Sequence, residues 1–137
     1  MSNDKPVGTS MVFVNSDDKI ILLLRDDIPT IKCPNCWDLV GGHPEGNETP
    51  EQCIVREVKE ETEIEIINPK LFKVYEMEDR DEYTFWQKAD FEIEDINLHE
   101  GQRLQWFSEE EIKNIPNDKI GFNFKPVILE FFQKKLY

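Results

Sequence analysis

Hydrophobic residues near the start of the chain fall into two short runs that predict strands. Residues 9–14 (TSMVFV) and 19–24 (KIILLL) are rich in β-branched and aliphatic side chains, which is typical of strands bounded by turns. The polar residues 15–18 (NSDD) between them favour a turn, so the two runs are predicted to form a β-hairpin. Farther along, residues 37–40 (WDLV) predict a short strand that runs into a Gly-Gly pair.

A well-marked helix start follows at Thr49. Thr49 can act as the N-cap, Pro50 suits the first helical position, and Gln52 stands where a capping box has Glu or Gln. The helix is predicted to pack on the sheet through its more apolar stripe. This stripe consists of Ile54, Val55, Val58 and Thr62.

The second half of the chain alternates between strand and helix patterns. The expected elements are strands at 65–77, 82–93 and 103–107, a charged turn at 78–81, a short helix capped by Ser108 and an amphipathic helix at 122–136. Strands on both sides of a central helix, followed by further helices, predict an α/β fold in which a mixed sheet is sandwiched between helices. The sequence has no linker or internal repeat, so a single domain is expected over residues 1–137.

Composition and charge narrow the class of function. Hydrophobic residues make up 39% of the 137-residue chain, which is enough for a packed core. The 29 acidic residues against 16 basic ones give a net charge of -13, which opposes binding to polymeric nucleic acid or to an anionic membrane surface. A small polyphosphate can still bind where divalent cations neutralise an acidic cluster. No apolar run is long enough to cross a bilayer.

The three cysteines indicate a reducing compartment. Their number is odd, and no N-terminal apolar segment resembles a signal peptide, so a cytoplasmic location is expected. Cys33 and Cys36 form a single C-x-x-C pair, and without a second pair they do not supply the four ligands of a structural zinc site. Cys53 is expected to be a small packing residue of the helix.

Three carboxylates of the predicted helix point the same way. At 100° per residue, Glu57, Glu60 and Glu61 fall within about 100° of arc on one side of the helix. Such a set is often only a solvated charged face. Hard cations such as Mg²⁺ or Mn²⁺ nevertheless prefer oxygen ligands, and a divalent ion can activate both a phosphate and a water. The set is therefore a candidate metal face.

The residues around these carboxylates favour the metal interpretation. Residues 42–64 read Gly-x5-Glu-x7-Arg-Glu-Val-Lys-Glu-Glu-Thr-Glu-Ile, and they resemble the Nudix box, G-x5-E-x7-R-E-U-x-E-E-x-G-U with U aliphatic, at every position but Glu63. The resemblance implies the Nudix fold, with a mixed sheet between helices. It also implies a MutT-like Nudix hydrolase that acts on phosphorus-containing acid anhydrides, with Mg²⁺ or Mn²⁺ as its cofactor.

The resemblance also assigns roles to the matching positions. The implied metal ligands are Glu57, Glu60, Glu61 and the carbonyl of Gly42. Glu57 can alternatively assist as a base, a role that varies within the family. Arg56 would pair with Glu48 and hold the loop against the helix, which supports the catalytic carboxylates rather than reacting itself.

Glu63 is the one departure from the family pattern. The glycine of the family sits where the helix ends, and a left-handed cap costs a non-glycine residue on the order of 1 kcal/mol. Glu63 therefore predicts either a differently finished helix or modest strain. On the helical projection its side chain points away from the metal face.

A further acidic candidate, Glu100, lies outside the box. Residues 100–102 (EGQ), followed by Trp106, resemble the stretch of MutT-type members in which a glutamate enters the site from a loop. Glu100 is therefore the candidate general base or additional metal ligand. The alternative is an exposed loop acid.

Five residues are candidates for contact with the substrate. Arg25 closes the second strand, where many Nudix enzymes place a cation that contacts phosphates, although a surface arginine is the alternative. His43 follows the glycine pair and is expected to line the site. MutT-type members have a purine-reading asparagine two residues before a proline, and here that place is Phe124, with Asn123 one residue earlier. Phe124 or Phe122 could stack on a base, or both could be core residues.

Three functions are consistent with this sequence. The expected one is metal-dependent hydrolysis of a diphosphate linkage in a nucleoside triphosphate or a related nucleoside diphosphate derivative, with a small nucleotide-like substrate. The alternative is a hydrolase of a nucleoside diphosphate sugar or dinucleoside polyphosphate, although such members often carry additional elements and this chain is short. The third is a non-catalytic nucleotide-sensing module, but such modules commonly lose box carboxylates and here all remain. Nudix domains are often homodimers, so a homodimer is a further expectation.

Overall fold

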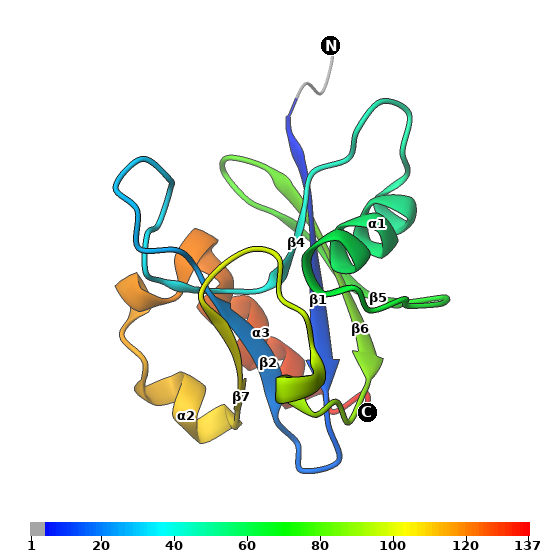
Figure 1. Cartoon of the computed structure of the whole chain (residues 1–137). Helices are drawn as coiled ribbons and strands as arrows, with labels where there is room; N and C mark the ends of the chain where they lie inside the picture. The colour runs from blue at the N-terminus through cyan, green and yellow to red at the C-terminus, as the bar shows by residue number, and fades with distance from the viewer. Residues whose placement is uncertain (1–4) are drawn as a thin grey trace.

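A seven-stranded mixed sheet forms the middle of the molecule in the computed structural model, which describes residues 5–137 (Figure 1). The central strand β1 (Val7–Val14) pairs in parallel with β6 (Asp81–Lys88) and antiparallel with β2 (Ile20–Leu24). β5 (Lys70–Glu76) pairs with β6, and β7 (Arg103–Phe107) pairs with β2. The expected domain begins at residue 1, and its first four residues lie outside the described ones.

The hairpin predicted from the sequence is confirmed. Val14 of β1 lies opposite Ile20 of β2, and the side chain of Asn15 accepts two backbone hydrogen bonds across the turn, both of 2.9 Å. β1 begins two residues earlier than expected, at Val7, because its first residues pair with β6.

The strand predicted at residues 37–40 is instead divided in two. β3 (Trp37–Asp38) pairs with β2, whereas β4 (Val40–Gly42) pairs with β1, and Leu39 between them is buried. β1 and β2 meet at the hairpin, and away from it each offers an edge to one half of this segment. The chain therefore crosses from one strand to the other at Leu39.

Alternating side chains of the strands pack under helices on both faces of the sheet. On one face, α1 (Pro50–Thr62) packs in a cluster with Met11, Phe13, Ile21 and Leu23. On the other face, α3 (Phe124–Lys134) packs in a cluster with Val12, Val14, Ile20 and Leu22, and α2 (Glu109–Asn114) contacts α3. Figure 1 shows α1 and α3 on opposite sides of the sheet, which confirms the predicted sandwich.

The capping box predicted at Thr49 is present, and the predicted cap Ser108 also forms one. At α1, Thr49 Oγ1 accepts a hydrogen bond from the Gln52 backbone N–H (3.1 Å), and Gln52 Oε1 accepts one from the Thr49 N–H (2.9 Å). Ser108 and Glu111 make the same reciprocal pair at α2. These caps explain why the two helix starts could be read from the sequence.

The end of α1 has the left-handed geometry that favours glycine. Glu63 has φ 65° and ψ 7°, and its N–H donates to the carbonyl of Lys59 (2.8 Å). Of the two outcomes expected for Glu63, the structure shows the strained one, since this conformation costs a side-chain-bearing residue about 1 kcal/mol.

Two strand boundaries predicted from the sequence are wrong. The strand expected from residue 65 begins at Lys70, because Pro69 has no N–H to donate and Asn68 has a φ of 51°. The strand expected to reach residue 93 ends at Lys88, which is the partner of the last residue of β1. The 3₁₀ helix η1 (Ile93–Asp95) follows it.

The start of the last helix also differs from the expectation. It was predicted at residue 122 but lies at Phe124, because Phe122 and Asn123 have positive φ values of 56° and 61°. The 3₁₀ helices η2 (Asn117–Lys119) and η3 (Gly121–Asn123) precede it. Within residues 5–137, no helix has the length and apolar character needed to span a membrane.

Candidate active site

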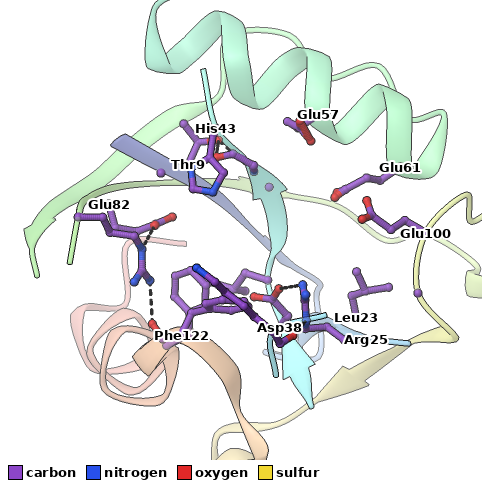
Figure 2. Close-up of a pocket in the computed structure, with 18 of the residues that line it drawn as sticks. Thr9, Leu23, Arg25, Asp38, His43, Glu57, Glu61, Glu82, Glu100 and Phe122 are labelled. Carbon is purple, nitrogen blue, oxygen red and sulfur yellow. Dashed lines mark hydrogen bonds and ion pairs between the residues drawn. The ribbon is translucent and has the colours of Figure 1, made fainter. Parts of the chain in front are cut away.

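A cleft of about 960 Å³ lies between α1, the loop before β7 and the segment that precedes α3. Figure 2 shows Glu57 and Glu61 of α1 and Glu100 of the loop along one side of it. Arg25, Asp38 and Phe122 lie on another side. The cleft thus brings together residues from both ends of the sequence, from Pro6 to Phe124.

Arg56 links the loop before α1 to the carboxylates of the helix. Its Nε and Nη2 atoms donate to the two carboxylate oxygens of Glu48 (2.6 and 3.0 Å), which is the pairing that the family pattern implies. Its Nη1 atom donates to Glu57 and to Glu60, at 3.0 Å each. The Arg56 hydrogen bonds lower the pKa of Glu48. Arg56 therefore neutralises part of the acidic face and orders the loop.

Glu61 has no such cation. It is 5% exposed, and its Oε2 atom has no hydrogen-bond partner within the described part of the chain. Burial, together with the charges of Glu100 and Glu57, raises the pKa of Glu61 to about 9. Burial also raises the pKa of Glu57, although Arg56 opposes this. The charged form of Glu61 lacks a counter-ion of its own.

Gly42 lies directly against Glu57. A Cβ atom at Gly42 would lie 2.3 Å from the Glu57 carboxyl carbon, so a larger residue would displace the carboxylate. The carbonyl of Gly42 accepts a hydrogen bond from Thr9 Oγ1 (3.1 Å) and keeps a second lone pair.

The oxygen atoms of the α1 glutamates and of the Gly42 carbonyl suit a divalent cation. Their side chains do not converge on a single point. Among residues 5–137, no three His, Cys, Asp or Glu side chains are gathered closely enough to hold a metal ion. Arg56 holds the Glu57 and Glu60 carboxylates by hydrogen bonds. A cation would nevertheless be stabilised here, because the buried Oε2 atom of Glu61 faces the charge of Glu100 and has no hydrogen-bond partner among the residues that the structure describes. All the candidate ligands are oxygen atoms, which hard ions prefer.

A family model described as the NUDIX domain matches residues 4–128. The chain belongs to the Nudix family. It is similar to the ADP-ribose pyrophosphatase of Methanocaldococcus jannaschii, with 30% identity over 124 residues that cover 89% of this chain and 70% of that protein. It is also similar to the RNA pyrophosphohydrolase of Zymomonas mobilis, with 27% identity over an alignment that covers 95% of this chain and 88% of that protein.

Solved structures support the same assignment at the level of the fold. The MutT protein from Methanosarcina mazei Go1 superposes with a TM-score of 0.72 at 23% identity, and the match covers 98% of each chain. The protein is therefore a hydrolase with the Nudix fold and belongs to a pyrophosphohydrolase family. Nudix hydrolases generally use divalent metal ions.

The Nudix fold places Arg25 and His43 at the cleft, as expected from the sequence. Arg25 donates to Asp38 Oδ2 (3.3 Å) and lies over the ring of Phe122, 4.9 Å from its centroid. The Nε atom of Arg25 donates to the carbonyl of Lys32 (3.0 Å), which fixes the guanidinium. His43 is exposed, and its Nδ1 is 3.0 Å from the carbonyl oxygen of Val7.

Asn123 and Phe124 are placed differently from the expectation. Asn123 is exposed and is not among the residues that line the cleft, because it turns away in the left-handed conformation that starts α3. Phe124 borders the cleft but is 4% exposed and belongs to the core under α3. The aromatic ring that faces the cleft beside Arg25 is that of Phe122, the other stacking candidate (Figure 2).

The charged residues Asp38, Arg80 and Glu82 line the cleft but were not expected there from the sequence. Asp38 faces Arg25, and burial raises the pKa of Asp38 to about 7 while Arg25 opposes this rise. Glu82 accepts a 2.6 Å hydrogen bond from Nε of Arg80, and Nη2 of Arg80 donates to the carbonyl of Phe122 (2.7 Å). Arg80 stands in a run of charges that predicts an exposed turn, so only its spacing of two residues from Glu82 hinted at a pair.

Proposed function

We propose that this Nudix hydrolase cleaves a diphosphate linkage in a nucleoside triphosphate or a related nucleoside diphosphate derivative, with Mg²⁺ as its cofactor and Mn²⁺ as a substitute. One observation carries the proposal. The carboxylates of Glu57, Glu61 and Glu100 lie together at the wall of a single cleft, with Arg25 across it, and burial and the charge of Glu100 both raise the pKa values of Glu57 and Glu61. Such a set suits a substrate that brings phosphate oxygens and divalent cations together.

The residues that would hold the cation are those of the acidic wall. They are Glu57, Glu60, Glu61 and the carbonyl of Gly42. A bound divalent ion would offset their charge and make the phosphorus more electrophilic. Arg56 and Glu48 keep the wall in place through their paired hydrogen bonds.

The remaining groups account for the hydrolytic step. Glu100 accepts the proton of the attacking water. The water oxygen bonds to one phosphorus, the bond from that phosphorus to the bridging oxygen breaks, and the bridging oxygen leaves with the second phosphate. Arg25 binds the phosphate oxygens and offsets the charge that builds on them.

The cleft supports a substrate of nucleotide size. Its volume of about 960 Å³ falls at the upper end of the range for small-molecule sites, roughly 300–1,000 Å³. Phe122, held by Arg80 and covered by Arg25, offers a ring on which a base can stack. A nucleoside triphosphate fits this arrangement. A nucleoside diphosphate sugar is the second candidate, and the similarity to an ADP-ribose pyrophosphatase over 89% of this chain favours it.

A substrate panel tests the proposal. Purified protein would be incubated with nucleoside triphosphates, diphosphate sugars and dinucleoside polyphosphates in saturating Mg²⁺, with phosphate and pyrophosphate detected separately. Release of pyrophosphate from a triphosphate, abolished by EDTA, supports the first candidate, and a monophosphate pair from a diphosphate sugar supports the second. Binding without turnover of any member would overturn catalysis in favour of a nucleotide-sensing module.

A further inference from the structure

Glu63 joins the end of α1 to the loop that carries Glu100. Its Oε2 atom is hydrogen bonded to Nε2 of His99, and its Oε1 atom accepts a hydrogen bond from Nδ2 of Asn97 (3.3 Å). The family pattern has glycine at this position, so a residue without a side chain would leave both loop residues without these contacts.

The backbone of the same loop is attached to α1 two residues before Glu63. The N–H of His99 donates to the carbonyl of Glu61 (2.8 Å), and the residue after His99 is Glu100. Glu100 in turn faces Glu61 in the cleft (Figure 2). The position of the Glu100 carboxylate therefore depends on two neighbouring attachments to α1, one through the backbone and one through the side chain of Glu63.

The other end of the loop is anchored separately. Gly101 has a φ of 86°, and a Cβ atom there would lie 2.5 Å from Cδ1 of Leu23. The backbone N–H of Gln102 donates to the carbonyl of Leu24 (2.8 Å). Glu100 thus stands between a tight β2 contact on one side and the Glu63 contacts on the other.

Stability alone does not explain a glutamate at this position. The side chains of Glu63 and His99 are each 52% exposed, and exposed pairs of this kind contribute little to folding. The backbone of Glu63 is in the conformation that favours glycine. What the side chain adds is a fixed place for the loop.

We propose that Glu63 is a positioning residue that holds Glu100 toward Glu61 through His99 and Asn97. This inference rests on the proposed function, in which Glu100 acts in the cleft. In this chain, the residue that replaces the glycine of the family pattern would therefore help to preorganise the acidic wall.

The substitution Glu63→Gly tests the inference because it removes the contacts and relieves the backbone at once. The melting temperature should stay the same or rise. Amide hydrogen exchange across residues 96–101 should become about 10-fold faster. The kcat should fall, and the Kd for Mn²⁺ should rise, by about 10-fold, while the KM for the substrate changes less than twofold. The matched control is Glu65→Gly, an exposed glutamate two residues away, which should leave exchange in 96–101 unchanged.

Two further variants separate the causes. His99→Ala should reproduce the faster exchange and lower kcat, and the double variant Glu63→Gly with His99→Ala should be no worse than either single one. Wild-type exchange in residues 96–101 together with wild-type kcat in Glu63→Gly would overturn the inference. Glu100→Gln distinguishes the two proposals. If Glu100→Gln is impaired and Glu63→Gly is not, only this inference fails, whereas full activity of Glu100→Gln removes Glu100 from the proposed function.

Discussion

Two buried glutamates of the same cleft have opposite surroundings. Glu82 is 2% exposed and accepts a 2.6 Å hydrogen bond from Arg80, whereas Glu61 is 5% exposed and faces Glu57 and Glu100. Burial raises the pKa of both. At Glu82 the arginine opposes the rise, and at Glu61 the neighbouring carboxylates add to it.

This difference shows which of the two carboxylates receives a counter-ion from the protein itself. A charge buried beside its counter-ion needs no further ligand, although it contributes little net stability. A carboxylate buried beside other carboxylates remains unsatisfied until a cation arrives. Each of the two carboxylates has a buried Oε2 atom without a hydrogen-bond partner among the described residues, but only Glu82 has an arginine beside it, and we propose the cation for the Glu61 wall.

The largest effect should come from Glu61→Gln. Because the amide cannot replace a charged metal ligand, kcat/KM should fall on the order of 10³- to 10⁴-fold, or roughly 4–5.5 kcal/mol of activation free energy. The melting temperature of the metal-free protein should not fall at neutral pH, since Gln is neutral like the protonated Glu61 side chain that the raised pKa favours. Steady-state kinetics with saturating Mg²⁺ and thermal denaturation provide the two readouts. Near-wild-type rates would remove Glu61 from the metal face.

Removing the counter-ion of the other glutamate should act on stability instead. Arg80→Ala leaves the Glu82 carboxylate buried without its cation, which should cost about 3 kcal/mol or more of the free energy of unfolding. Urea denaturation at neutral pH measures this cost. A loss below about 1 kcal/mol would show that Glu82 finds another partner, and the contrast between the two walls would then be lost.

Two glycines allow a smaller, matched test. A Cβ atom at Gly8 would lie 2.3 Å from the Glu82 carboxylate, and one at Gly42 would lie 2.3 Å from the Glu57 carboxyl carbon. Gly8→Ala should therefore lower the free energy of unfolding by about 1–3 kcal/mol. Gly42→Ala should chiefly raise the Kd for Mn²⁺, because it displaces a proposed ligand. Equal effects of both variants on stability would contradict this division.

The most gradual effect is a pH dependence of stability, which is spread over several pH units. The pKa of Glu61 is about 9 in the folded protein against an ordinary value of 4.5, so the folded state retains a proton that the unfolded state has lost. The contribution of Glu61 is favourable below pH 4.5 and is lost as the pH rises toward 9, at up to about 1.4 kcal/mol per pH unit. In EDTA, the melting temperature should fall more steeply with rising pH for the wild type than for Glu61→Gln. Parallel curves for the two proteins would show that Glu61 is not the titrating group.

Much of the fold follows from local patterns in the sequence. The structure contains the predicted hairpin around Asn15, the capping box at Thr49, the helix capped by Ser108, the strand at 103–107 and the sandwich of helices around the sheet. Each of these depends on residues close together in the sequence, so periodicity and cap residues suffice. Spacing in the box likewise brings Glu57 and Glu61 to one side of α1, and the fold carries Glu100 to the same wall.

The structural features that the sequence did not predict depend on contacts between distant segments. The break at Leu39 arises because β1 and β2 separate beyond their hairpin, which no local pattern reveals. Arg80 looks like a turn residue until β6 brings it beside Phe122, 42 residues away. The exposed position of Asn123 likewise follows from the left-handed start of α3 rather than from its distance to a proline.

The parallel pairing of β1 with β6 also fixes the order in which the site can assemble. Ser10 and Thr84 hydrogen bond across this pair at 2.9 Å although they lie 74 residues apart, and Gly8 is the register partner of Glu82. Loop closure over such a separation is slow compared with the formation of a capped helix. We therefore expect the acidic helix to form during folding before the wall that faces it. The cleft is completed only when the second half of the chain returns to the first strand.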